Sequence, residues 1–211
     1  MDTKEKNERM KQPCRQIRAN FTESTITVYQ AYPAVIGIPA LRAGRFVPPF
    51  KIGRMTWIKP SFLWMMYRCG WGRKPDQEVV LAIEITRSGF ESALAHSSLS
   101  HFEAETYATE EEWEKCKAAS PVRIQWDPER TLALGEKDYR SIQIGISGDA
   151  VTQYVNEWIV KLTDVTPLAH EIEGLVRAQK LTEAEARLPS ETPYPISDDL
   201  EKVIGATKLA R

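Results

Sequence analysis

Five stretches of the chain have the residue pattern of β-strands. Residues 25–32 are rich in β-branched and aromatic side chains, which favour strands. Residues 78–86 form a more uniformly apolar run, typical of a strand in the middle of a sheet. Shorter strands are expected at 54–59, 122–126 and 140–146.

Helical signals lie between and after these strands. Residues 61–69 are apolar on nearly every side and follow Pro60, so they predict a buried helix that hides Trp64 and Met65. Thr109 and Glu112 form a capping box, which marks the start of a helix over 110–119. Further helices are expected at 34–43, 149–162, 167–180, 182–188 and 198–204.

Strands and helices are mixed without strict alternation, which favours the α+β class over a doubly wound sheet. We expect a single domain over 14–188 that contains a mixed or antiparallel sheet of about five strands flanked by helices, with a helical C-terminal extension. Residues 1–13 lack a periodic apolar face and predict a disordered tail. Residues 189–211 predict a C-terminal tail with a short helix.

Charge is distributed unevenly along the chain. The whole protein has a formal net charge of −1, yet residues 13–75 hold ten basic residues and one acidic residue, Glu23. Aromatic residues are interleaved with the cations between Trp57 and Trp71. Guanidinium groups bind phosphate in a forked geometry and flat rings stack on bases, so this half of the chain predicts a site for a phosphorylated, base-containing ligand.

Several other classes of protein are disfavoured. No apolar run approaches the roughly 20 residues that a membrane span needs, and the first residues lack a signal-peptide core, so a cytoplasmic protein is expected. The three cysteines are widely spaced and indicate reduced thiols. His96 and His101 fit no standard ligand spacing, so no metal is expected. P-loop and Rossmann fingerprints are also absent from the sequence.

The arginines and lysines that border predicted strand and helix ends are the best candidates for ligand contact. Arg54 and Lys59 bracket one strand, and Ser61 begins a helix whose free N–H groups form an anion site. Arg68 ends the same helix, where a cation also stabilises the helix dipole. Arg15 and Arg18 precede the first strand, and we expect all these cations to converge in space. An ordinary ion-pair network with the acidic half of the chain is the alternative.

The runs RQIR from Arg15, ITVYQAY from Ile26, PPF from Pro48 and RMTWIKPSFLWMMYR from Arg54 resemble an uncharacterised family, domain of unknown function 4291. The likeness extends to about Ala186. It implies one continuous domain and carries no established activity.

The order of elements is also similar in layout to the ADP-ribosyltransferase fold. In that fold the first strand carries an Arg or His, the second a Ser or an aromatic residue, and a later strand a Glu, and NAD lies across their edges. The resemblance implies Tyr29 or Gln30, then Thr56 or Ser61, and then Gln143 at these places. Here the first strand has neither Arg nor His, and Gln143 replaces the acid.

Together these observations predict a nucleotide-binding enzyme that is similar to an NAD-dependent ADP-ribosyltransferase. Gln30 and Gln143 are the candidate catalytic residues. The candidate ligand contacts are Arg15, Arg18, Tyr29, Arg54, Thr56, Trp57, Lys59, Ser61 and Arg68. One rival is an RNA or single-stranded nucleic-acid binder without catalysis. Another is a structural partner-binding protein whose basic half meets acidic segments of another copy.

Overall fold

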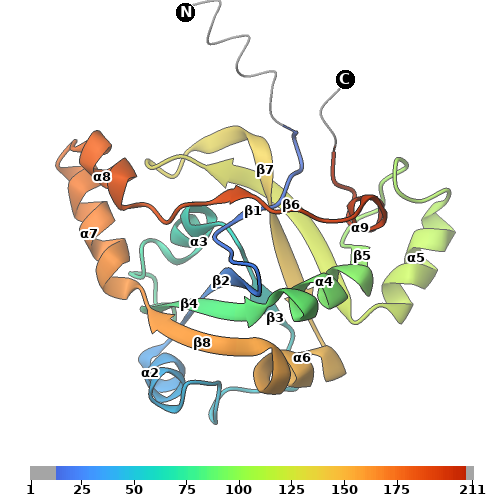
Figure 1. The fold of residues 1–211 in the computed structure, drawn as a ribbon, viewed down its shortest axis with the longest axis horizontal. Helices are drawn as coiled ribbons and strands as arrows, with labels where there is room; N and C mark the ends of the chain where they lie inside the picture. Colours follow the sequence, from blue (N-terminus) through green and yellow to red (C-terminus); the bar gives the residue numbers. More distant parts are fainter. Residues whose placement is uncertain (1–12, 208–211) are drawn as a thin grey trace, which may run out of the picture.

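The fold was obtained as a computed structural model that describes residues 13–207 (Figure 1). Within that range, eight α-helices surround strands in three small sheets of two, three and four strands, so the α+β class is confirmed. The prediction of a single sheet of about five strands is wrong. All strands were expected in one sheet, whereas β2 (Thr25–Tyr32) pairs with β4 (Val79–Thr86), and β3 (Thr56–Ile58) pairs with β7 (Glu136–Ile146) in a different sheet.

The three-stranded sheet has the order β2-β4-β8 and is antiparallel. It contains β2 (Thr25–Tyr32), β4 (Val79–Thr86) and β8 (Ile159–Asp164). The apolar run of β4 lies in the middle, as its composition predicts, because both of its edges are paired with neighbouring strands.

The four-stranded sheet has the order β3-β7-β6-β5. Its strands are β3 (Thr56–Ile58), β7 (Glu136–Ile146), β6 (Val122–Arg130) and β5 (Ser97–Leu99), and β5 runs parallel to β6. An isolated bridge between Tyr29 and Lys59 joins the end of β3 to β2, with the Tyr29 N–H donating to the Lys59 carbonyl at 2.7 Å. The two larger sheets therefore meet beside Lys59.

Most predicted helices are present. They are α2 (Ala34–Ala43), α3 (Phe62–Cys69), α5 (Glu110–Ala119), α7 (Thr166–Arg177), α8 (Leu181–Arg187) and α9 (Asp198–Val203). Several elements were not foreseen, among them a helix and a short strand. Helix α4 (Arg87–Ala95) follows β4 directly, where the Thr86 side chain accepts from the Gly89 N–H, and β5 is a short, serine-rich strand.

The prediction of one helix over 149–162 is wrong. Helix α6 covers Asp149–Gln153, a π-helical turn covers Tyr154–Trp158, and the remainder is strand β8. The pattern that suggested one amphipathic helix comes from Tyr154, Val155 and Trp158, which are all buried. From Ile159 onward the chain pairs with the open edge of β4, and that backbone pairing outweighs helical periodicity.

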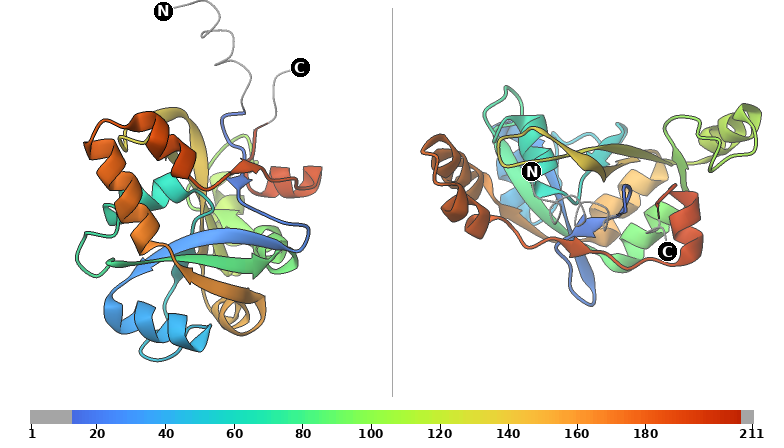
Figure 2. Two further views of the ribbon diagram at one scale, coloured as in Figure 1. Left: turned by 60° about the vertical axis from the view of Figure 1, so that its left-hand side comes forward. Right: turned by 90° about the horizontal axis from the view of Figure 1, so that it is seen from above.

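The C-terminal segment packs on the rest of the molecule. Strand β9 (Thr192–Pro193) pairs with β1 (Arg18–Ala19), and both lie side by side in the views of Figure 2. Tyr194 and Ile204 are buried, and the Trp126 indole N–H donates to the Ile204 carbonyl at 2.7 Å. The predicted N-terminal tail, 1–13, lies outside the described residues apart from Pro13. Within residues 13–207 no helix has both the length and the apolar character of a membrane span.

Replacing Trp64 should destabilise the protein strongly. Trp64 and Met65 are 5% and 2% exposed, so their predicted burial is confirmed. We expect Trp64→Ala to lower the free energy of unfolding by about 3–5 kcal/mol, because a large ring leaves a cavity in the core. Urea unfolding gives this value. Val35→Ala, at an exposed position of α2, is the control and should change stability by less than about 0.5 kcal/mol. Equal stabilities of the two variants would contradict the packing described for α3.

Candidate functional site

The four-stranded sheet has an apolar face and a polar face. Ile58, Ile144 and Ile124 lie in register on β3, β7 and β6, and all three are buried in the core. Since side chains alternate along a strand, the intervening positions face the opposite side. These positions, with the residue that follows β3, carry rings, amides and charges: Trp57, Lys59, Gln125, Asp127 and Gln143.

Trp57, Lys59 and Gln143 line a cleft of about 790 Å³. Its other walls come from the end of β2, the loop 49–55, helix α3 and the turn 75–77. Seven of the eleven predicted site residues line this cleft: Gln30, Arg54, Thr56, Trp57, Lys59, Arg68 and Gln143. Sequence reasoning missed several others, which come from the loop, the turn and the end of β2: Tyr32, Phe50, Lys51, Asp76 and Gln77.

The cleft gathers positive charge. Its lining includes four cations, Lys51, Arg54, Lys59 and Arg68, and one carboxylate, Asp76. Among residues 13–207 none of these four cations forms a salt bridge. Arg68 donates to the Gln77 side-chain carbonyl at 3.2 Å, which leaves its charge uncompensated. Like charges that outnumber the counter-charges beside them favour the binding of an anion.

Lys59 is the most buried of these cations, with 6% of its surface exposed. Its Nζ donates to the Trp57 carbonyl at 3.4 Å and lies 5.1 Å from the centre of the Trp64 ring. Burial, aided by the nearby charge of Arg68, lowers the pKa of Lys59 to about 7 against a smaller opposing effect of Asp127. Much of the Lys59 amine is therefore uncharged at neutral pH.

Trp57 lies against Gly145, its partner in the β3–β7 register. A Cβ atom added to Gly145 would come within 2.9 Å of three atoms of the six-membered indole ring. Three equal distances mean that the ring lies flat over the glycine, which has no side chain to keep it away. Because Trp57 is only partly buried and lines the cleft, it offers a flat aromatic wall for a ligand.

Gln30 is 3% exposed and is held by three hydrogen bonds. Its amide group donates to the Thr56 hydroxyl at 2.6 Å and to the Trp57 carbonyl at 3.0 Å. Its carbonyl accepts from the buried Tyr154 hydroxyl at 2.8 Å. This network fixes the start of β3, so the contacts favour a positioning role for Gln30 over the catalytic role expected from the sequence.

Gln143, on β7, is held by a side chain of the neighbouring strand β6. Its amide donates to the Asp127 carboxylate, which also accepts from Gln125 at 2.9 Å. Asp127 was not singled out from the sequence, although it lies two residues beyond Gln125 on the same face of β6. It is the acidic group that orients Gln143 beside the cleft.

The start of α3 does not offer the phosphate site that was expected there. The Ser61 side chain accepts from the Trp64 N–H at 3.1 Å and donates to Glu129 at 2.9 Å. Glu191 accepts from the Phe62 N–H at 2.7 Å. Burial, with a contribution from the nearby Glu129, raises the pKa of Glu191 to about 8. Carboxyl groups of the protein itself therefore occupy the helix N-terminus, and Ser61 is a structural cap.

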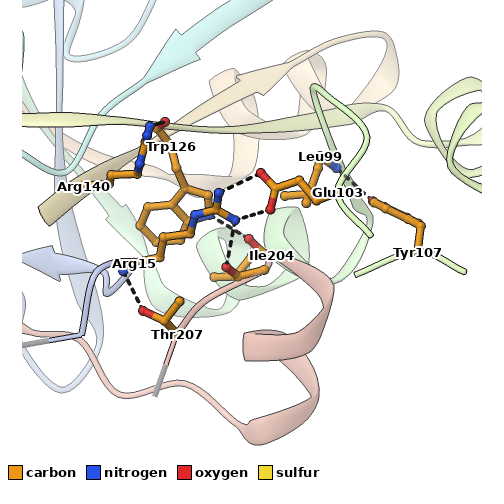
Figure 3. A network of polar contacts seen from close by, with 9 residues as sticks. Arg15, Leu99, Glu103, Tyr107, Trp126, Arg140, Ile204 and Thr207 are labelled. Atoms are coloured by element: carbon orange, nitrogen blue, oxygen red, sulfur yellow. Dashed lines mark hydrogen bonds and ion pairs between the residues drawn. The ribbon is translucent and has the colours of Figure 1, made fainter. Parts of the chain in front are cut away.

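Arg15, Arg18 and Tyr29 also lie outside the cleft lining. The Arg15 guanidinium pairs with both oxygens of Glu103, and the Arg15 backbone N–H donates to the Thr207 hydroxyl at 2.8 Å (Figure 3). The Arg18 guanidinium lies 4.6 Å from the centre of the Tyr139 ring. Tyr29 is buried against Phe62. The expected convergence of cations therefore holds for Arg54, Lys59 and Arg68. It fails for Arg15 and Arg18, because Glu103 and Tyr139 hold these two outside the cleft lining.

Comparison with known proteins identifies the domain. The domain of unknown function 4291 (DUF4291) matches residues 16–194. The chain belongs to this family. The DUF4291 match extends past β9 to Tyr194, which agrees with the packing of this segment on the main domain. No curated protein and no solved structure matches the chain, so the likeness to ADP-ribosyltransferases has no structural neighbour to support it.

The role of Gln30 can be tested by a double-mutant cycle with Tyr154. Gln30→Leu should lower the free energy of unfolding by about 1–3 kcal/mol, because it removes the acceptor of the buried Tyr154 hydroxyl and the shorter of two hydrogen bonds to the Trp57 carbonyl. Combining it with Tyr154→Phe should reveal a coupling energy of about 0.5–3 kcal/mol. Denaturant unfolding of the four proteins measures both. Unchanged stability in Gln30→Leu would instead favour a role confined to the ligand.

The uncharged state of Lys59 predicts a pH-dependent stability. Above about pH 7 the unfolded chain keeps a proton on Lys59 that the folded protein loses, so stability rises with pH between about 7 and 10. Glu191 acts in the opposite direction below about pH 8, since its folded pKa is raised. Because Glu191 is present in both the natural protein and Lys59→Met, its effect cancels in the difference between their free energies of unfolding.

We expect Lys59→Met to be more stable than the natural protein at pH 6, by a margin that shrinks as the pH approaches 10. Free energies of unfolding measured at several pH values test this. A margin independent of pH would show that Lys59 is charged in the folded protein.

Proposed function

We propose that the cleft binds a nucleotide, with its phosphates on the cations and its planar ring on Trp57. The observation that carries this proposal is the gathering of Lys51, Arg54, Lys59 and Arg68 in one cleft without a salt bridge among residues 13–207. A volume of about 790 Å³ lies within the range of small-molecule and cofactor sites.

NAD is the nucleotide that we expect, and its chemical groups fit the cleft. Exposed guanidinium groups of Arg54 and Arg68 suit a pyrophosphate, since each presents several N–H donors in a fixed plane. The ring of Trp57 suits nicotinamide or adenine. Gln143, oriented by Asp127, presents amide hydrogen-bonding groups that suit a ribose hydroxyl. When bound, NAD would supply an ADP-ribosyl group for transfer to an acceptor.

Transfer of ADP-ribose remains the reaction that we propose, by analogy with the fold layout. Of the residues that the analogy names, Gln30, Thr56 and Gln143 come from three different strands and line one cleft, whereas the alternatives Tyr29 and Ser61 lie outside its lining. The side chains of the three that line it are two amides and one hydroxyl. The Gln143 amide donates to the carboxylate of Asp127, which lies behind it. The residues therefore bind and orient, and Asp127 fixes the direction of the Gln143 amide.

The same features weigh against an extended nucleic-acid track. Arg15 and Arg18 contact Glu103 and Tyr139 and lie outside the cleft lining. These two arginines therefore do not extend the positively charged surface beyond the cleft. A thermal-shift screen with NAD, ATP, GTP and a short RNA separates the alternatives, because a ligand of the folded state raises the melting temperature. Preference for RNA, with affinity that grows with length and falls steeply with salt, would favour the nucleic-acid binder.

Removal of Arg54 should weaken nucleotide binding without loss of stability. We expect Arg54→Ala to reduce the binding free energy by about 1.5–3 kcal/mol, the value of a hydrogen bond to a charged group. The melting temperature of the ligand-free protein should stay unchanged or rise, because one of several repelling charges is gone.

Titration calorimetry and thermal melting of the same variant measure both effects. Arg15→Ala is the matched control: it loses the pair with Glu103, so it should melt at a lower temperature and bind the nucleotide normally. Lower stability of Arg54→Ala with unchanged binding would contradict the proposal.

A further inference from the structure

We propose that Lys59 is an amine nucleophile that forms an imine with the aldehyde or ketone carbonyl of a phosphorylated ligand held in this cleft. The inference rests on the phosphate-binding part of the proposed function. It adds a covalent step and a class of ligand that nucleotide binding alone does not require.

The placement of Lys59 is unusual for a structural lysine. Fully buried lysines are almost always paired with an acid, yet among residues 13–207 no carboxylate lies within salt-bridge distance of Lys59. Its amine faces the Trp64 ring and the Trp57 carbonyl, and it lines the cleft. An aliphatic side chain would fill the same space without the cost of burying an amine.

The charges around Lys59 favour the neutral amine. Helix α3 contributes Arg68, whose positive charge opposes protonation, and Cys69, whose effect in the other direction is small. Strand β6 contributes Asp127, which favours the protonated form but is engaged by Gln143 and Gln125. Burial is the largest influence on the pKa of Lys59, which falls to about 7. A lysine desolvated beside another cation is a known way to obtain a reactive amine.

The chemistry needs no further reactant. The nitrogen lone pair of Lys59 attacks the carbonyl carbon, and one of the two nitrogen protons passes to the carbonyl oxygen, which gives a carbinolamine. Loss of the nitrogen proton and the hydroxyl group as one water leaves a carbon–nitrogen double bond. Arg54, Arg68 and Lys51 would hold the phosphate of the ligand, so the carbonyl is presented to the amine that lines the same cleft.

Pyridoxal 5′-phosphate is a suitable probe, because it combines a planar ring, a phosphate and an aldehyde. The protein is incubated with this probe near pH 7.5, the imine is reduced with borohydride, and the modified peptides are located by mass spectrometry. We expect the adduct at Lys59 to form at least about tenfold faster than at any exposed lysine, since ordinary lysines are almost wholly protonated at this pH.

Pyridoxal without the phosphate is the matched probe, and it should label Lys59 more slowly. Lys59→Arg keeps the charge and should lose the fast adduct, whereas Lys51→Arg should retain it. Labelling spread over exposed lysines, or fast labelling that persists in Lys59→Arg, would overturn the inference. If Lys59→Arg does not fold, the peptide map of the natural protein still decides the question, because it locates the adduct directly.

The two proposals fail in different ways. Nucleotides that bind in the thermal-shift screen while Lys59 stays unlabelled would refute the amine nucleophile and leave nucleotide binding intact. Fast labelling of Lys59 that inorganic pyrophosphate blocks, in a protein to which no nucleotide binds, would support the nucleophile and refute the nucleotide proposal.

Discussion

The alternation of side chains across β3, β7 and β6 is the constraint on which the site depends. Because Ile58, Ile144 and Ile124 must face the core, the residues between and beside them are turned to the opposite side. A shift of β3 by one residue would bury Trp57 in the core and expose an isoleucine. The same register that forms the core therefore places Trp57 and Lys59 at the cleft.

A second constraint fixes the helix above this face. The N-terminus of α3 is held by Ser61 and by two carboxyl groups, one of which, Glu191, comes from the C-terminal segment. N–H groups at a helix start need hydrogen-bond acceptors, and here side chains of the protein itself supply them. As a result α3 keeps the Trp64 ring over Lys59, and residues far apart in the sequence determine the environment of one amine.

Local patterns predicted much of this arrangement and missed the parts set by distant contacts. The burial of Trp64 and the strand before Lys59 follow from periodicity and from Pro60, so they could be predicted. The strand at 159–164 could not, because its structure depends on the free edge of β4. Charge alone likewise does not distinguish Arg15 from Arg54. The first meets Glu103, which lies 88 residues away along the chain, and the second meets no acid among residues 13–207.

Several basic residues outside the cleft are paired with carboxylates, unlike the cations that line it. Arg73 and Arg177 both pair with the buried carboxylate of Glu173, at 2.6 and 2.7 Å, and Arg15 pairs with Glu103. Each of these arginines has a carboxylate partner. The cleft is different: its four cations share the lining with one carboxylate, Asp76, so neighbouring cations repel each other. Asp127, behind Gln143, is engaged by two amides. Repulsion of this kind raises the free energy of the empty cleft, and an anionic ligand relieves it on binding. The buried amine of Lys59 follows from the same arrangement, because the positive charge that attracts the ligand also favours loss of the lysine proton.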